Sequence, residues 1–352
     1  MKKPKIVDKK WLVIAIIIVF LVVFSLLEEQ KNVSSRSIVL AISLDLKDDE
    51  YEMGIQVLKT DGQKDKQEFL TYSATANQMT DVISKLSQDT GAAVSLCHTM
   101  VLILGQDLLT KDNDKAIRFF VENEELCNNT MVVASKGSPL EVLSATLSNG
   151  QGGGYYVGGM LRNIVSDLGV IPIIIKDYIK NRYRIGGSVY MPCVSLEKSG
   201  DTTFIDVKES FVTDGNNYAI LSETATKGLS LALNKLKNGQ LSYSFDDKMG
   251  QVDIVKSSAD IKAQQDSATM KIKAKLNDRA YVPENIDEKR SIEELQKSIK
   301  SYVEECFTTC QAQGLDVFFL GQRVYAQGKD FYTKSDFLEN MQLKVEVDIT
   351  MK

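Results

Sequence analysis

The chain has 352 residues, of which 43% are hydrophobic and 25% are charged. These proportions are those of a globular protein, and the length predicts two or three domains rather than one hydrophobic core. The formal net charge of -5, without a basic block beyond residue 10, excludes a typical nucleic-acid-binding protein.

The N-terminus combines a basic leader with a long apolar run. Residues 1–10 carry five lysines against Asp8, and residues 11–27 are apolar almost throughout. This run reaches the lower end of the length that spans a bilayer as a helix, and the lysines predict a cytoplasmic N-terminus. Everything after residue 28 should then lie outside the cytoplasm. The expected membrane anchor includes Trp11, Leu12, Val13, Ile14, Phe20, Phe24 and Leu27.

A cleaved secretory signal peptide is the alternative to an uncleaved anchor. Such a peptide has a shorter apolar segment and small residues at its cleavage site. No Ala-x-Ala pattern follows Leu27, and the first cysteine that a lipid could modify is Cys97. We therefore predict a transmembrane signal anchor at residues 11–27 and no lipidation.

Alternating hydrophobicity marks the first strands beyond the anchor. Apolar residues recur at every second position over residues 38–44 and 51–57, with a charged turn between them. This pattern predicts an antiparallel hairpin. A third strand is expected near residues 68–72, a helix over 79–86 and a central strand over 100–104.

The next segment alternates helix and strand without a regular β-α-β rhythm. We expect a helix near residues 117–121, a strand over 131–134 and a helix that begins at Ser138. Ser138 as N-cap, Pro139 at the first helical position and Glu141 form a capping box. This order favours a mixed α+β fold over a doubly wound parallel sheet.

Residues 149–159 contain six glycines and two tyrosines. The segment lacks the Lys-Ser/Thr pair of a P-loop and the strand–Gly-x-Gly-x-x-Gly–helix context of a dinucleotide site. We therefore predict a flexible surface loop. A helical stretch over 160–183, kinked or divided at Pro172, and a strand near Val189 should follow.

A charged turn at residues 197–201 predicts a boundary between an N-terminal region, 28–198, and a C-terminal region, 199–352. In the second region, apolar and polar residues alternate over 269–276 and 341–351, which predicts half-buried strands of an antiparallel sheet. The predicted fold class is therefore α+β: a transmembrane helix, then serial mixed domains whose antiparallel sheets are covered by helices.

A long amphipathic helix is predicted between these two strands. Ser291 and Glu294 form a capping box, apolar residues follow at intervals of three and four as far as Cys310, and Gly314 supplies the stop. We expect this helix to lie on the sheet. Cys306 and Cys310 fall on its apolar face, which favours packing over a redox or ligand role.

Cysteine and histidine limit the chemistry of the chain. The five cysteines include no Cys-x-x-Cys pair, so their spacing indicates neither a disulfide framework nor a zinc site. His98 is the only histidine, and if it shared a strand with Cys97 the two side chains would point to opposite faces. Acidic pairs such as Glu304-Glu305 indicate solvated charge. We predict no catalytic residue, no metal and no cofactor.

Four blocks, at residues 38–45, 95–105, 219–229 and 314–321, resemble in their order and spacing a family of spore proteins. In these blocks the chain is similar to the Ger(x)C family, the C subunits of nutrient germinant receptors. The likeness extends through nearly all of the chain after the anchor. The motif residues that carry it are Asp45, His98, Gly105, Glu223, Thr224, Asp316 and Gly321.

The resemblance implies three α+β domains packed in series. It also implies a non-catalytic subunit that works with two integral membrane partners at the inner spore membrane in nutrient-triggered germination. Whether the subunit itself binds a small molecule does not follow from it. Typical members begin at a lipid-modified cysteine, which this chain lacks, so that the uncleaved helix would replace the lipid.

Two alternatives to a germination role are consistent with the residues. One is a single-pass envelope protein, unrelated to germination, that binds cell-wall polymer or a secreted partner. The other is an envelope enzyme with carboxylates gathered around His98 in a deep pocket.

Overall fold

The computed structural model describes residues 17–20, 36–59, 68–111, 113–122, 126–163, 168–200, 202–236, 239–245, 248–264, 266–277, 288–328 and 337–351. Within the predicted anchor, residues 17–20 are helical and exposed, so that Phe20 is described. Trp11, Leu12, Val13, Ile14, Phe24 and Leu27 lie outside the described residues, and the anchor stays a prediction. In the described part of the chain, no helix is both long and apolar enough to cross a membrane.

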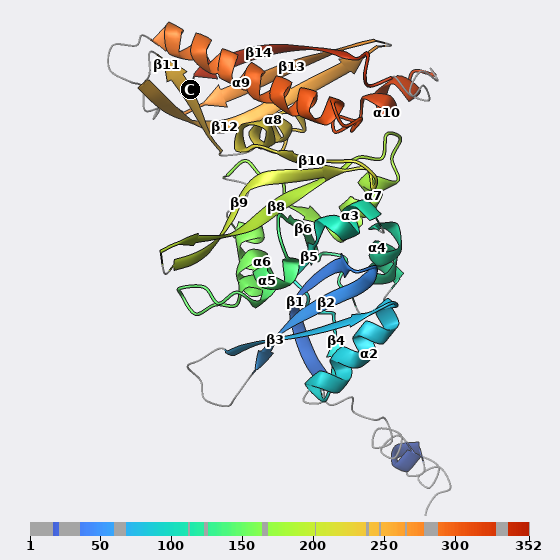
Figure 1. Ribbon diagram of the computed structural model, residues 1–352. Helices are drawn as coiled ribbons and strands as arrows, with labels where there is room; N and C mark the ends of the chain where they lie inside the picture. Colours follow the sequence, from blue (N-terminus) through green and yellow to red (C-terminus); the bar gives the residue numbers. More distant parts are fainter. Residues whose placement is uncertain are drawn as a thin grey trace, which may run out of the picture.

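A large mixed sheet occupies the lower two thirds of the molecule in Figure 1. Its strands follow the order β10-β9-β8-β6-β5-β1-β2-β3, while β4 pairs with β1 and β7 pairs with β6. The strands are β1 (Arg36–Lys47), β2 (Glu50–Lys59), β3 (Glu68–Ala76), β4 (Ala93–Ser95), β5 (Val101–Leu104), β6 (Met131–Ser135), β7 (Ile173–Ile174), β8 (Val189–Ser199), β9 (Thr202–Thr213) and β10 (Tyr218–Leu221).

Helices cover both faces of this sheet. Leu102 and Leu104 of β5 belong to one apolar core, and Val101 and Ile103 belong to another, as the two-residue period of a strand requires. The first core is covered by α2 (Met79–Thr90), α3 (Gln106–Lys111), α4 (Asn113–Glu122) and α7 (Ile175–Arg182), and the second by α5 (Pro139–Ser144) and α6 (Gly153–Asn163).

The α+β class is confirmed, and so are the predicted hairpin of β1 and β2 and the central strand β5. The expectation of antiparallel sheets is wrong for the centre, where β1, β5, β6 and β8 run parallel to one another. The helices α3 and α4 between β5 and β6 return the chain to the same end of the sheet, which produces a parallel neighbour. Antiparallel pairing is kept on both flanks.

The prediction of a flexible loop over residues 149–159 is wrong from Gly153 onward. From Gly153 the segment forms α6, and Gly153 and Gly154 are buried. A Cβ atom on Gly154 would lie 2.5 Å from the Cβ of Ala41, and one on Gly153 would lie 2.0 Å from the carbonyl oxygen of Val142. Only glycine allows the helix to approach β1 and α5 so closely. The predicted helical stretch is divided, but before Pro172: α6 ends at Asn163, β7 follows the proline and α7 begins at Ile175.

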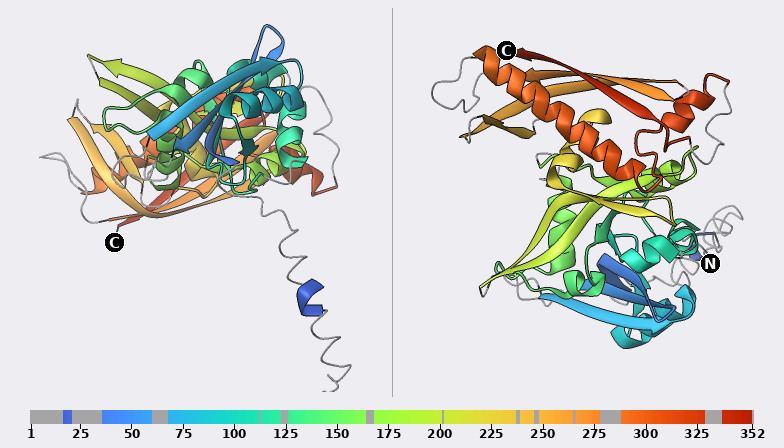
Figure 2. Two further views of the ribbon diagram at one scale, coloured as in Figure 1. Left: turned by 90° about the horizontal axis from the view of Figure 1, so that it is seen from below. Right: turned by 45° about the horizontal axis from the view of Figure 1, so that its top comes forward.

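A second sheet lies above the first and carries a long helix across it (Figures 1 and 2). Its order is β11-β12-β13-β14. The strands are β11 (Gln240–Phe245), β12 (Lys248–Ala263), β13 (Ser267–Leu276) and β14 (Gln342–Met351), and the helices are α8 (Glu223–Ala232), α9 (Glu288–Gln311) and α10 (Leu320–Tyr325).

Two details of this sheet correct the sequence predictions. β13 and β14 pair parallel, because α9 crosses over between them and reverses the direction of the chain. Ser291 lies inside α9 and is not its N-cap: it is buried and accepts a hydrogen bond from the Tyr243 hydroxyl at 3.4 Å. The predicted stop at Gly314 is confirmed by its positive φ of 70°.

The two sheets share one apolar core at their junction. Val212, Ala219 and Leu221 of the large sheet belong to the same cluster as Ile299 and Val303 of α9. The turn at residue 200, where the sequence predicts a regional boundary, joins β8 to β9 within one antiparallel ladder. The large sheet therefore continues past that turn as far as β10.

Candidate functional site

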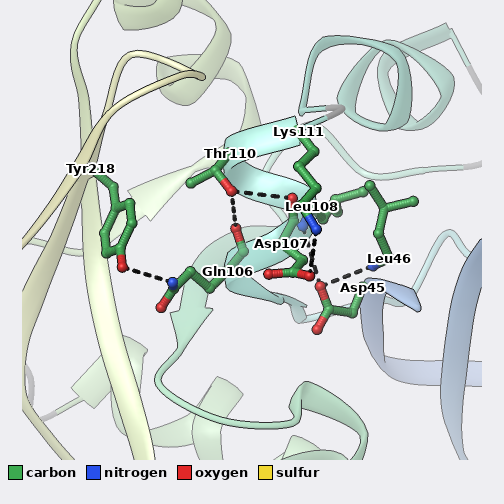
Figure 3. Close-up of polar contacts among 8 residues, drawn as sticks. All are labelled: Asp45, Leu46, Gln106, Asp107, Leu108, Thr110, Lys111 and Tyr218. Atoms are coloured by element: carbon green, nitrogen blue, oxygen red, sulfur yellow. Dashed lines mark hydrogen bonds and ion pairs between the residues drawn. The ribbon is translucent and has the colours of Figure 1, made fainter. Parts of the chain in front are cut away.

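The first pair of family-motif residues lies where β1 meets α3 (Figure 3). The Asp45 carboxylate accepts hydrogen bonds from the backbone N–H of Leu46 at 2.9 Å and of Leu108 at 3.3 Å. A Cβ atom on Gly105 would lie 1.8 Å from the Asp45 carboxyl carbon. Asp45 and Gly105 thus form one unit, in which a carboxylate supplies a partner for a helix N-terminus. Burial raises the pKa of the Asp45 carboxyl.

Contacts made by the same short helix, α3, link β1 in the middle of the large sheet to β10 at its edge. Gln106 donates a hydrogen bond of 2.9 Å from its amide to the Tyr218 hydroxyl on β10. The Tyr218 ring in turn stacks on Phe211, with centroids 5.3 Å apart. On the exposed side, Lys111 pairs with Asp107 at 2.9 Å, and that carboxylate raises the pKa of the lysine. The first turn of α3 is therefore held by both β1 and β10.

The second motif pair repeats this arrangement at α10. Asp316 is 7% exposed, and its two carboxylate oxygens accept hydrogen bonds from the backbone N–H of Leu320 at 2.8 Å and of Gly321 at 2.7 Å. A Cβ on Gly186, which follows α7, would lie 3.0 Å from the same carboxylate. Asp316 therefore holds α10 in place close to the turn that follows α7.

Burial raises the pKa of Asp316 above its usual 3.8, which gives a testable pH dependence. The folded chain binds this proton more tightly than the unfolded chain, so the resulting stabilisation is fully present below pH 3.8 and is lost as pH rises through the folded pKa. The free energy of unfolding of wild type, minus that of Asp316→Asn, should therefore fall as pH rises. Urea titrations at a series of pH values measure this difference, and a rising difference would contradict the assignment.

The third motif lies at the start of α8, facing α9. Ser222 and Thr224 both donate hydroxyl hydrogen bonds to the carboxylate of Glu305, at 2.5 Å and 2.7 Å. Ser222 also accepts from the N–H of Ala225 at 3.1 Å as the N-cap, and Glu223 pairs with Lys227 at 2.8 Å. The prediction of solvated charge is therefore wrong for Glu305, because its carboxylate joins two helices.

His98 lies apart from the contacts described above. It shares an exposed turn after β4 with Cys97, so the strand geometry considered for these two residues is wrong. The Cys97 sulfur lies 3.2 Å from the Ser95 hydroxyl. Among the described residues, no group of three or more His, Cys, Asp or Glu side chains could hold a metal ion.

The buried cysteines behave as apolar packing groups. Cys306 and Cys310 lie in the core beneath α9, and Cys193 lies in the large sheet. Burial raises the pKa of the Cys193 thiol to about 12, and it raises the pKa of Cys306 well above the usual value. The thiols of Cys193 and Cys306 are therefore protonated at neutral pH, which removes the thiolate that nucleophilic or metal chemistry needs.

Protein-family models match two long regions of the chain. One, described as "Spore germination protein N-terminal domain", matches residues 29–196, and the other, "Spore germination B3/ GerAC like, C-terminal", matches residues 211–352. The chain belongs to the Ger(x)C family of spore germination proteins. Among curated proteins, no sequence matches it significantly.

A solved structure titled "Crystal Structure of the GerBC protein" has a similar fold. The TM-score is 0.57 at 17% sequence identity, and the match covers 88% of this chain and 96% of that chain. The likeness therefore extends through both sheets and is not restricted to one of them. At this identity it shows a common Ger(x)C fold.

The structure pairs four of the seven Ger(x)C motif residues with one another, while Glu223 and Thr224 contact Lys227 and Glu305. It brings Asp45 to Gly105 and Asp316 to Gly321, and it leaves His98 in an exposed turn. Sequence reasoning missed Glu305, whose one available signal is its place beside the apolar stripe of α9. It also missed the buried Gln56, which accepts from the N–H of Tyr155 at 2.8 Å and fixes the start of α6.

Proposed function

We propose that this Ger(x)C protein is a membrane-anchored, extracytoplasmic subunit of a germinant-receptor-like complex that takes part in nutrient-triggered spore germination. It acts by contact with integral membrane subunits, at the inner spore membrane. The observation that carries the proposal is the match of two germination-protein models to residues 29–196 and 211–352, which together span nearly all of the chain after the predicted anchor.

The polar motif contacts support a role in contact rather than in catalysis. The carboxylates of Asp45 and Asp316 accept from backbone N–H groups at helix starts, and that of Glu305 accepts from two hydroxyls of α8. Groups engaged in this way stabilise helix positions. The motif residues therefore act as a scaffold that fixes the relative positions of α3, α8 and α10.

The predicted anchor supports the assignment to a membrane. A spanning helix at residues 11–27 would hold the protein without the lipid of typical family members. It would also place an apolar surface within the bilayer, where the integral subunits lie.

Affinity capture from detergent-solubilised spore membranes tests this proposal. The tagged full-length chain should co-purify multi-span membrane subunits and should resist extraction by alkaline carbonate. An Ile17→Lys/Phe20→Lys variant should be extracted, because each lysine at the centre of a spanning helix costs about 3 kcal/mol.

The matched control introduces the same two lysines on the second sheet. Met249 and Val255 are exposed apolar residues there, and Met249→Lys/Val255→Lys should remain in the membrane fraction. Recovery of a free, soluble polypeptide trimmed near residue 28, without membrane partners, would overturn the proposal.

A further inference from the structure

A cleft opens at the junction of the two sheets, apart from the three motif contacts described above. Its volume is about 310 Å³, at the lower end of the range of small-molecule sites. One wall comes from β7, α7 and β8 of the large sheet, and the other comes from the turn after α8 and from α10. Its lining includes the charged side chains of Asp177, Lys180, Arg184, Lys235 and Arg323.

The charge of this cleft is opposite to that of the chain. Among the described lining residues, four cationic side chains stand against the single carboxylate of Asp177, whereas the whole chain carries -5. Among the described residues, no ion pair is formed by Lys180, Arg184 or Lys235. A cleft lined by one sign of charge concentrates counter-ions of the other sign.

Asp316 lies close to Arg323 and offsets part of its charge. Both oxygens of this carboxylate accept hydrogen bonds from the start of α10, and the guanidinium keeps donors of its own. Arg323 uses one N–H group on the carbonyl oxygen of Ile261 at 3.3 Å. The remaining donors of its guanidinium and the two lysine ammonium groups are available to a ligand.

The wall behind these cations is ordered and partly apolar. Asn181 is 6% exposed and bonds to the buried Tyr190 hydroxyl. The Arg184 guanidinium lies 4.8 Å above the ring of Phe319, a non-glycine residue held at a φ of 56°. Backbone strain of this kind persists only where the surrounding structure fixes it. The stacking holds one face of the guanidinium and leaves its N–H edge for a planar oxyanion.

We propose that this cleft binds a small organic anion whose carboxylate or phosphate group contacts Lys180, Arg184, Lys235 and Arg323. The aliphatic side chains of Ile171 and Ile173 and the ring of Phe319 would contact the apolar part of the ligand. Because the cations come from both sides of the junction, the bound anion bridges α7 to α8 and α10. The site belongs to this chain alone and does not depend on the receptor assignment.

Binding measurements on the full-length chain in detergent test the site. Calorimetric titration with citrate, glutamate and inorganic phosphate should show saturable binding of at least one of them. Citrate or glutamate binding identifies a carboxylate ligand, and binding of phosphate alone identifies a phosphate ligand. Lys180→Glu/Lys235→Glu should weaken the binding at least about 100-fold, since each lost charge-assisted contact corresponds to roughly tenfold.

A variant with the same net charge provides the control. Lys273 and Lys275 are exposed on β13 and do not line the cleft, so Lys273→Glu/Lys275→Glu should bind as wild type does. All four lysines are exposed, and thermal unfolding checks that both variants fold. Equal affinity in the two variants, or no binding of any of the three anions to wild type, overturns the proposal. The proposal is also overturned if Lys180→Glu/Lys235→Glu keeps its anion affinity but no longer captures the membrane subunits, because the cleft would then hold an acidic segment of a partner.

Discussion

Replacement of Gly228 with alanine should lower the free energy of unfolding by about 3 kcal/mol, because it forces α8 away from α9. A Cβ atom on Gly228 would lie 2.1 Å from the carbonyl oxygen of Tyr302, which is backbone and has no rotamer in which to withdraw. α9 cannot simply shift, because the Tyr302 hydroxyl donates to the Ser242 carbonyl of β11 at 2.8 Å. Urea unfolding followed by far-ultraviolet circular dichroism measures the loss.

Gly159 offers the matched control for this substitution. It lies within α6, and a Cβ atom there would meet nothing within 4 Å. Alanine is the better helix former, so Gly159→Ala should raise the free energy of unfolding by up to about 1 kcal/mol. If both substitutions shift stability in the same direction, close packing is not the reason for the glycine at position 228.

Gly105→Ala should be comparably harmful, and its effect should depend on Asp45. The three nearest atoms to the added Cβ all belong to the Asp45 carboxyl group, at 1.8 to 2.1 Å. The carboxylate has to leave the N–H groups of Leu46 and Leu108 to make room, so we expect a loss of about 3 kcal/mol. Asp45→Ala alone should cost about 2 kcal/mol through loss of the cap.

The double variant separates this mechanism from general disruption of α3. Once Asp45 is alanine, the atoms that block the added Cβ are gone, and Gly105→Ala should cost little more. The double-mutant cycle should therefore give a coupling energy of about 2 kcal/mol or more. Additive losses would show that Asp45 is not what requires glycine at position 105.

Local patterns predicted those elements whose form depends on local sequence. The alternation in residues 38–57 predicts the β1–β2 hairpin because one face of that hairpin has to be buried, and the cap at Ser138 is made by its own side chain 3.2 Å from the N–H of Glu141. Strand direction depends on connections instead. Nothing in the alternation of β13 and β14 distinguishes a parallel from an antiparallel pair, and the crossover of α9 decides it.

The glycine-rich segment shows a conflict between local preference and packing. Glycine disfavours helix by about 1 kcal/mol per residue, so the sequence predicts a loop. In the structure, the absence of side chains lets α6 lie against Ala41 and Val142. The contact between Gly154 and Ala41 joins residues more than a hundred positions apart, which a local pattern does not contain.

The sequence identified most residues of the candidate site, but it did not predict which of them contact one another. The family resemblance singles out Asp45, Gly105, Asp316 and Gly321, yet only the last two are near enough in sequence to suggest a cap. Asp45 and Gly105 meet because β1 and β5 are neighbours in the large sheet. The junction cleft gives no sequence signal at all, since its four cations come from three separate helices and turns.

The hairpin of β8 and β9 limits the positions at which recombination with a related gene can give a folded hybrid protein. A recombination event at residue 199 would divide one antiparallel ladder between two parents, and each hybrid would then have to match hydrogen bonds along the entire length of both strands. A crossover after Leu221, between β10 and α8, would leave both sheets intact. Hybrids formed there have only to match side chains in the apolar core that the sheets share, which tolerates substitution far better than a broken strand pair does.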